Sequence, residues 1–282
     1  MQRISRYGMQ GDTILGAPEE QCISGTLGND LIYGHYQQVE TYVGEDGNTY
    51  VQNNDGSIPP PPIKPDFIFA WSGNDTIWAS QASDTVIGGE GNDLIRGNGI
   101  FGSTGRGENS YAMWDAADVL LGGAGDDGIS GAGGDDFIMG EEGNDRLSGD
   151  WGRDILLGGQ GADTLIGGFD ADTMTGGQGA DTFTFGFGNI PYAGNSIRPE
   201  TGTGQGNRDV ITDFQPGLDK IVLMDVSQAT GAILIITEDA GNTVLNYAGR
   251  HPFLPDTLQN SYRAEIELVG RVNVSMSDIV VG

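Results

Sequence analysis

The stretch GGQGADTLI (residues 158–166) is followed without a break by GGFDADTMT (167–175) and GGQGADTFT (176–184). These stretches share a nine-residue pattern, G-G-x-G-x-D-x-U-x, in which U is a large apolar residue. Seven such units follow one another in a single phase, and their first residues are Gly122, Gly131, Gly140, Gly149, Gly158, Gly167 and Gly176. A strict period of this length predicts a solenoid in which each unit stacks on its copies.

Two places in the unit carry the pattern. The sixth place is always aspartate: Asp127, Asp136, Asp145, Asp154, Asp163, Asp172 and Asp181. The eighth place is always large and apolar: Ile129, Ile138, Leu147, Leu156, Leu165, Met174 and Phe183. The seventh to ninth places therefore predict a short strand with its middle side chain in the core. The glycine-rich first six places predict a tight bend, because glycine tolerates positive φ angles.

The same phase continues toward the N-terminus in weaker form. Its further sixth-place residues are Asp118, Asp93, Asp84, Asp75 and Asp30. The Pro and Lys neighbours of Asp66 make its unit a poorer site, and Gln21 breaks another unit. Two insertions, residues 34–60 and about 97–112, interrupt the series and are expected to bulge from one edge of the stack. Within the first, TYVGEDGNTYVQ (41–52) predicts a β-hairpin, because β-branched and aromatic residues flank a Gly/Asp/Asn turn.

The sequence thus predicts an all-β chain. Residues 1–184 form a right-handed parallel β-roll, degenerate over 7–121 and regular over 122–184. After Thr184 the period stops and segments such as DVITDF, DKIVLM and SDIVVG read as ordinary strands. We therefore expect residues 185–282 to form a C-terminal antiparallel β cap that covers the open end of the solenoid.

The spacing also predicts a chemistry. Two units make one coil of 18 residues, so every second unit lies about 4.8 Å from its neighbour in a column. One expected column holds Asp118, Asp136, Asp154 and Asp172, and the other holds Asp127, Asp145, Asp163 and Asp181. Carboxylates stacked this closely repel one another unless cations lie between them. Carboxylate and carbonyl oxygens suit Ca²⁺, whereas zinc prefers His or Cys, of which the chain has three in all. A single aspartate in such a bend is equally explained as a turn former.

Composition limits the function. The 282 residues carry a net charge of −27 and include 49 glycines. Such a charge disfavours nucleic acids and anionic lipid surfaces as partners, and it favours cations. An apolar fraction of 37% is low for a core of this size, which indicates that metal or a regular repeat holds the chain together. Cys22 is alone, no apolar stretch is long enough to span a membrane, and the first residues lack the apolar run of a secretory signal.

Residues 122–184 closely resemble the β-roll of RTX (repeats-in-toxin) proteins, whose calcium-binding nonapeptide has this pattern. ADTFTFG (180–186) and DVITDFQPGLDKIVL (209–223) resemble the region after the β-roll in serralysin-type proteases, and SDIVVG resembles a C-terminal secretion signal. The resemblance implies export from a Gram-negative bacterium by a type I secretion apparatus. It also implies that bend carbonyls join the aspartates as ligands, here at Gly122, Gly125, Gly131, Gly140, Gly143, Gly149, Gly158, Gly161, Gly167, Gly176 and Gly179. Asp170 replaces the fourth-place glycine of its unit.

Three functions stay open. The favoured one is a secreted calcium-folded module with a structural, adhesive or partner-binding role. Trp71, Trp78, Trp114 and Trp151 could offer an aromatic surface to a glycan or cell-surface partner, but packing over the insertions and the stack ends is the favoured interpretation of these residues. The second is the calcium module of an extracellular enzyme. The chain has neither HExxH nor G-x-S-x-G, which argues against a protease or lipase site of its own. The third is a membrane-acting toxin, disfavoured because no long amphipathic segment is present.

Overall fold

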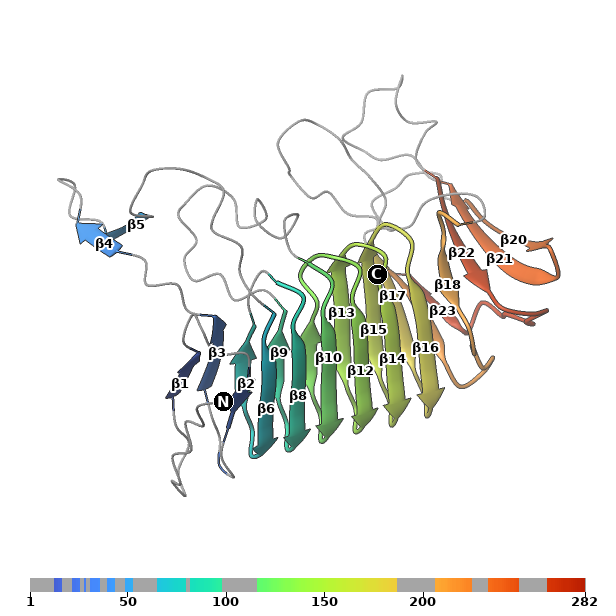
Figure 1. The fold of residues 1–282 in the computed structure, drawn as a ribbon. Coiled ribbons are helices and arrows are strands. Elements are labelled where there is room, and N and C mark those ends of the chain that lie inside the picture. The colour runs from blue at the N-terminus through green and yellow to red at the C-terminus, as the bar shows by residue number, and fades with distance from the viewer. Residues whose placement is uncertain are drawn as a thin grey trace.

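The computed structural model describes residues 13–16, 22–25, 28, 31–35, 40–43, 49–52, 65–79, 82–97, 116–186, 206–224, 233–248 and 263–281. Within these residues every regular element is a β-strand, and the strands stack into a long roll of two sheets (Figure 1). The predicted all-β parallel roll is confirmed.

The first sheet has ten strands, paired in the order β1, β3, β7, β9, β11, β13, β15, β17, β19 and β23. They span Thr13–Gly16, Leu31–His35, Thr76–Trp78, Leu94–Arg96, Gly128–Ser130, Arg146–Trp151, Thr164–Phe169, Thr182–Gly186, Lys220–Met224 and Ile279–Val281. All of its pairings are parallel.

The second sheet has eleven strands, in the order β2, β6, β8, β10, β12, β14, β16, β18, β22, β21 and β20. They span Cys22–Ser24, Phe67–Ser72, Thr85–Glu90, Val119–Ala124, Phe137–Glu142, Ile155–Gln160, Thr173–Gln178, Asp209–Ile211, Arg263–Leu268, Asn242–Ala248 and Ile233–Asp239. Consecutive units alternate between the two sheets, so one coil takes two units. In the regular part paired residues are 18 apart, as in Leu147 and Leu165.

The core is a single file of eighth-place side chains between the sheets. Ile138, Leu147, Leu156 and Leu165 are completely buried. Each strand of the regular part contributes only one or two buried apolar side chains, and the file continues from Ile23 to Ile279. The interior is therefore long and thin, as the low apolar fraction of the sequence indicates.

The residue offsets between paired strands give the lengths of the two insertions. Cys22 pairs with Phe67, an offset of 45 residues instead of 18, so this coil contains 27 additional residues. Thr85 pairs with Val119, an offset of 34, so that coil contains 16 additional residues. These excesses equal the lengths expected for 34–60 and 97–112. The predicted hairpin is confirmed as the antiparallel pair of β4 (Glu40–Val43) and β5 (Thr49–Gln52).

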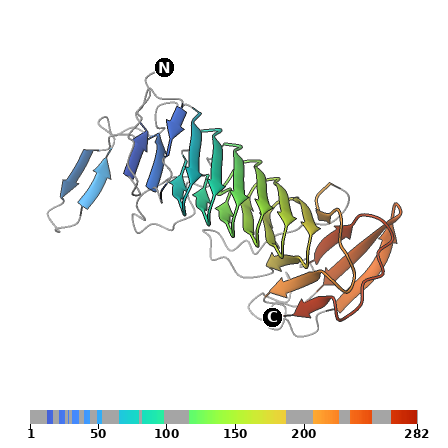
Figure 2. The same ribbon diagram turned by 90° about the horizontal axis from the view of Figure 1, so that it is seen from below.

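The C-terminal region combines two kinds of pairing. β20, β21 and β22 are antiparallel, as expected of the cap. β18, β19, β22 and β23 instead add in parallel to the roll, which therefore continues beyond residue 184 (Figure 2). The reason is that Ile211, Ile221, Leu268 and Ile279 extend the sheets and core without the glycine period.

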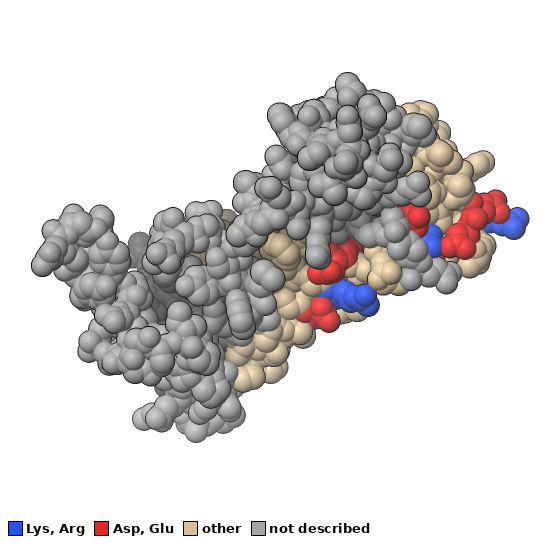
Figure 3. Space-filling model, turned by 90° about the horizontal axis from the view of Figure 1, so that it is seen from above, with Lys and Arg blue, Asp and Glu red and all other residues tan. Residues whose placement is uncertain are grey.

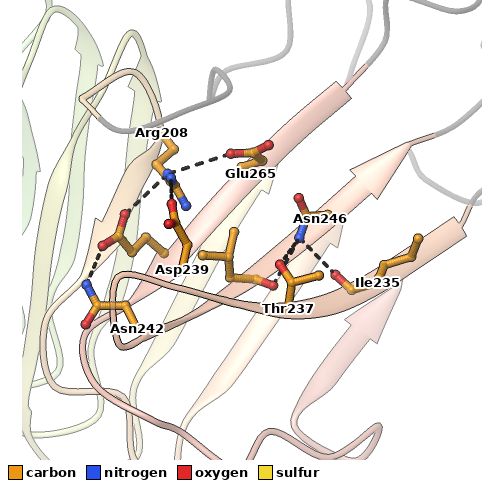
Figure 4. A network of polar contacts seen from close by, with 9 residues as sticks. Arg208, Ile235, Thr237, Asp239, Asn242, Asn246 and Glu265 are labelled. Carbon is orange, nitrogen blue, oxygen red and sulfur yellow. Dashed lines mark hydrogen bonds and ion pairs between the residues drawn. The ribbon is translucent and has the colours of Figure 1, made fainter.

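Arg208 holds this antiparallel part together. Its guanidinium is buried and contacts the carboxylates of Asp239 at 2.6 Å and Glu267 at 3.2 Å, with Glu265 at 3.7 Å (Figure 4). Glu267 also accepts a hydrogen bond from Asn242. A buried guanidinium thus offsets part of the negative charge of these three carboxylates, whereas the described bends of the roll contain no buried Lys or Arg.

Candidate metal centre

The bends of the roll form two edges with different contents. We call the bends from the first to the second sheet the interrupted edge, because both insertions and the long connection after β17 begin and end there. These connections join β3 to β6, β9 to β10 and β17 to β18. We call the bends from the second to the first sheet the uninterrupted edge. Both insertions therefore lie on one edge, as predicted.

Each edge carries one column of buried aspartates. The first column, on the interrupted edge, is Asp66, Asp84, Asp118, Asp136, Asp154, Asp172 and Asp209. The second column, on the uninterrupted edge, is Asp75, Asp93, Asp127, Asp145, Asp163, Asp181 and Asp219. All of these residues are at most 3% exposed. The structure thus brings together the predicted columns and lengthens both.

One oxygen of each carboxylate links neighbouring coils. The backbone N–H of Asp127 donates to Oδ1 of Asp145 at 2.9 Å, and that of Asp145 donates to Oδ1 of Asp163 at 2.8 Å. The same bond recurs along both columns at 2.7 to 3.1 Å. Oδ1 is therefore committed to holding the stack in register.

The other oxygen is buried without a hydrogen-bond partner among the described residues. This holds for Oδ2 of Asp93, Asp127, Asp136, Asp145, Asp154, Asp163, Asp172 and Asp181. A buried carboxylate oxygen left without a partner is costly, because burial removes the water that would otherwise solvate it. Eight repetitions of the same cost indicate that these oxygens have a common ligand.

The first-place glycine lets two oxygen atoms approach the same point of the bend. A Cβ added to Gly122 would lie 2.3 Å from Oδ2 of Asp127 and 2.9 Å from the carbonyl oxygen of Gly140. For Gly140 the corresponding distances are 2.1 Å to Asp145 and 2.7 Å to the carbonyl of Gly158. The position that a side chain would fill is thus a small space facing a carboxylate and a carbonyl of the next coil. All seven predicted first-place glycines face the Oδ2 of their own unit in this way.

The fourth-place glycines pack coil against coil. Gly143 and Gly161 have φ angles of 141° and 131°, which disfavour other residues. A Cβ on Gly161 would lie 1.7 Å from the carbonyl oxygen of Gly143, and Gly125 and Gly179 have the same surroundings. Asp170 takes a positive φ of 81° at this place, so the bend is kept despite the substitution.

The second insertion interrupts a bend without destroying its geometry. A Cβ on Gly97 would lie 2.3 Å from Oδ2 of Asp118 and 2.3 Å from the carbonyl oxygen of Gly131. Gly97 and Asp118 therefore act as the first and sixth places of one unit, although 20 residues separate them.

Burial changes the titration of the columns. Loss of water raises the pKa of Asp127 and Asp136 to about 7 and that of Asp154 to about 8, and neighbouring carboxylates add to the rise. Burial likewise raises the pKa of Asp93, Asp163 and Asp181 to about 6. The pKa of Asp145, Asp172 and Asp219 is also raised, first by burial.

The contrast is Asp278, whose pKa is lowered mainly because the backbone and hydroxyl of Ser275 donate to it. A carboxylate with its hydrogen bonds satisfied stays charged easily. The aspartates of the two columns do not, and they gain from a cation.

Some site residues were missed by the sequence reasoning, and one lies outside the described residues. Asp30 is not among the residues that the structure describes. Asp209 and Asp219 were missed, because their units lack the glycines. The signal was the D-x-U triplet in DVI (209–211) and DKI (219–221), the same triplet that remains in the unit of Asp118.

A second, outer ladder was also missed. Fifth-place side chains on the uninterrupted edge accept from the fifth-place N–H of the next coil. The bonds run from Asn92 to Asn74, Asp126 to Asn92, Asn144 to Asp126 and Ala162 to Asn144. Its signal was the Asn or Asp at every fifth place of this edge from Asn74 to Asn144.

The donor set fits a hard cation. No three His, Cys, Asp or Glu side chains converge on one point in the described ranges, so these ranges contain no zinc-like cluster of side chains. Each bend instead pairs a carboxylate Oδ2 with a main-chain carbonyl oxygen, as at Asp127 and Gly140. Oxygen donors of these two kinds are the ligands that calcium prefers.

These features define the chain as a parallel β-roll whose bends carry columns of buried carboxylates. Comparison with known families agrees: residues 23–36, 65–86, 78–99, 115–147, 130–165 and 157–189 match the RTX calcium-binding nonapeptide repeat. These segments, a little under half of the chain, are RTX calcium-binding repeats. No curated protein matches it.

Several solved structures resemble the chain. The extracellular lipase LipA from Serratia marcescens is 18% identical over 90% of this chain, with a TM-score of 0.36. The chain spans 45% of the length of that lipase. Two subunits of the Azotobacter vinelandii mannuronan C5-epimerase are 24% and 25% identical, with TM-scores of 0.30 and 0.31. They match 57% and 64% of this chain, and 91% and 84% of their own.

Proposed function

We propose that the chain is a secreted module that folds by binding several calcium ions in the bends of its roll. The ions would be held by Oδ2 of the column aspartates and by carbonyls of the first-place glycines. The supporting observation is the set of eight buried Oδ2 atoms without hydrogen-bond partners, each facing the first-place glycine of its unit. Calcium supplies the positive charge that this thin, acidic roll lacks.

The same columns explain how folding can depend on the compartment. With little calcium, two columns of neighbouring carboxylates repel and their burial is unfavourable, so the chain stays unfolded. At about 10⁻³ M calcium, binding and folding become one process. A chain that folds only outside the cell can be exported unfolded, which fits the type I route expected for RTX proteins. None of the described residues forms a helix long and apolar enough to cross a membrane.

We propose a structural or partner-binding role for the folded roll. Strands β6 to β17 stack into a rod whose bends would contain the cation ligands (Figure 1). Such a rod is suited to separate or present surfaces, and calcium would decide whether it exists.

Calcium titration tests this function. The full chain is purified with chelator, and far-ultraviolet circular dichroism and calorimetric heat are followed as CaCl₂ is added. We expect a cooperative gain of β signal with several ions bound per chain, and no comparable gain with the same concentration of MgCl₂. A full β signal in chelator, or an equal response to magnesium, would contradict the proposal.

A further inference from the structure

The outer surface of the second sheet is unusually apolar. Seventh- and ninth-place side chains of β6 to β14 point outward from the core, and we call nine of them the apolar face. They are Phe67, Phe69, Ile87, Val119, Leu121, Phe137, Met139, Ile155 and Leu157. No seventh or ninth place from β6 to β16 is charged, although the chain has 53 charged residues, 40 of them acidic.

The apolar face is accessible. Phe67, Val119 and Ile155 are 45%, 37% and 44% exposed, and the other six side chains are half-buried against one another. In Figure 1 the strands β6 to β16 turn this side toward the viewer, and no labelled element lies in front of them. A contiguous apolar patch of this extent on a soluble protein marks an interaction surface.

The roll itself does not require such a surface. On the outer side of the first sheet the equivalent places hold the polar Arg96, Ser130, Arg146, Ser148 and Thr164 beside the apolar Trp78, Leu94 and Ile166. The same coils thus fold with one mixed and one apolar outer side. The apolar side consequently calls for an explanation outside the fold.

We propose that the apolar face binds the apolar face of a second copy of this chain, forming a calcium-dependent dimer. This inference rests on the proposed calcium-dependent folding. Two chains that each carry a charge of −27 repel at long range, and bound calcium removes much of that charge. The face itself has no charged side chain to bury, so its pairing carries no desolvation cost of that kind.

The order of side chains fits a two-fold axis that runs along β10. Such an axis places β6 opposite β14 and β8 opposite β12, because β10 is the middle strand of the five. Phe67 then lies opposite Ile155, Thr85 opposite Phe137, and Val119 meets its own copy. All of these pairs are uncharged, so the two faces can pack as sheets at about 10 Å.

The size of the face sets the expected affinity. Three side chains that are 37% to 45% exposed and six half-buried ones offer on the order of 500 Å² per copy. The total, about 1,000 Å², lies just below the usual range of specific interfaces. We therefore expect a dissociation constant of roughly 1 to 100 µM instead of an obligate dimer.

Sedimentation equilibrium tests the dimer. The full chain is measured in millimolar calcium at roughly 2 to 200 µM, beside the double variants Ile155→Gln/Leu157→Gln and Thr164→Gln/Ile166→Gln. The second pair is the matched control, because it occupies the same two places on the outer side of the first sheet. We expect a concentration-dependent doubling of mass for the natural chain and the control. The Ile155/Leu157 variant should need a concentration at least tenfold higher.

Circular dichroism in calcium separates the two proposals. A natural chain that is folded but monomeric at 200 µM overturns the dimer and leaves the calcium-dependent fold intact, as does equal dimerisation of both double variants. If the Ile155/Leu157 variant does not fold, Phe137→Gln replaces it under the same criterion. A chain that does not gain structure in calcium contradicts the proposed function itself.

Discussion

The two edges of the roll solve the same folding problem with different tolerance. On the uninterrupted edge, six bends between Ser72 and Thr182 are short. In these bends the fourth-place glycine packs closely against the carbonyl oxygen of the fourth-place glycine one coil earlier. On the interrupted edge, the connections between successive strands differ greatly in length, although the strands that they join are equally regular. The two aspartate columns nevertheless have the same hydrogen bonds at nearly the same distances. What the bends of both columns share is therefore the aspartate at their end, whose Oδ1 binds the neighbouring coil.

The bend between Gly97 and Asp118 shows this most clearly. Twenty residues lie between these two places, whereas four residues lie between the first and sixth places of a regular unit. Closing a longer loop costs little additional entropy, so insertion there is affordable. The uninterrupted edge differs through its outer Asn/Asp ladder, in which each bend binds the next. On the other edge the described residues include one such bond, from Arg153 to Asp135. Figure 3 looks onto the molecule from above, where acidic and basic side chains of the described residues lie close together.

The largest expected effect on stability comes from substitutions at the fourth place, and it should differ between the two edges. Gly161→Ala would place a Cβ 1.7 Å from the carbonyl oxygen of Gly143 at a φ of 131°, so we expect a loss of at least about 2–4 kcal/mol. The control is Asp170→Gly on the interrupted edge, which relieves a positive φ and should change stability by less than about 1 kcal/mol. Denaturant unfolding in saturating calcium measures both. Equal effects would show that the edges do not differ in packing.

The next effect distinguishes the aspartate columns from the outer Asn/Asp ladder. Asp145→Asn keeps an Oδ1 acceptor for the N–H of Asp127 but removes the charge of Oδ2. We expect the calcium midpoint of folding to rise about tenfold, because fewer charged ligands weaken calcium sites. Asp126→Asn is the matched control, since Asn144 already serves at this fifth place. A calorimetric titration that finds both variants alike would assign the cation elsewhere.

A smaller effect is expected from shortening the interrupted bend. Deletion of residues 98–113 leaves four residues between Gly97 and Asp118, as in a regular unit. Because loop entropy changes slowly with length, stability should change by less than about 1 kcal/mol. Circular dichroism against calcium concentration provides the measurement. Loss of the calcium-induced β signal would mean that the insertion does more than lengthen the bend.

The smallest effect concerns pH without calcium. The folded pKa of Asp127, Asp136 and Asp154 lies above the ordinary value of 3.8, so the calcium-free fold binds protons more tightly than the unfolded chain. Its stability is then greatest at acidic pH and is lost as pH rises toward about 7 to 8. In calcium-free buffer we expect more β signal at pH 5 than at pH 8. A parallel pair in 0.5 M NaCl removes general charge repulsion, and identical spectra at both pH values would count against the prediction.

The sequence predicts the regular part of this molecule well for a physical reason. A strict nine-residue period repeats one set of contacts, so Ile138 or Asp145 identifies the role of every equivalent place. Prediction was weaker where the same contacts form without glycine. Asp209 and Asp219 continue the columns through strands that read as an ordinary cap, because backbone pairing with β16 and β17 replaces the glycine pattern.

The apolar face could have been read from the same period, since alternate residues of a strand point to opposite sides. It was missed because seventh and ninth places vary between units, and only the assignment of units to sheets separates Phe67, Val119 and Ile155 from Thr76, Gly128 and Arg146. That assignment depends on the two-unit coil, in which every second unit belongs to the same sheet.

The central claim is that cations between stacked bends hold the roll together, and long-wavelength diffraction from crystals of the full chain in millimolar calcium tests it most directly. We predict anomalous difference peaks along both columns, each beside an aspartate Oδ2 and a first-place carbonyl, as at Asp127 and Gly140. A folded roll whose bends show no anomalous density, with only water beside those oxygens, would contradict the account.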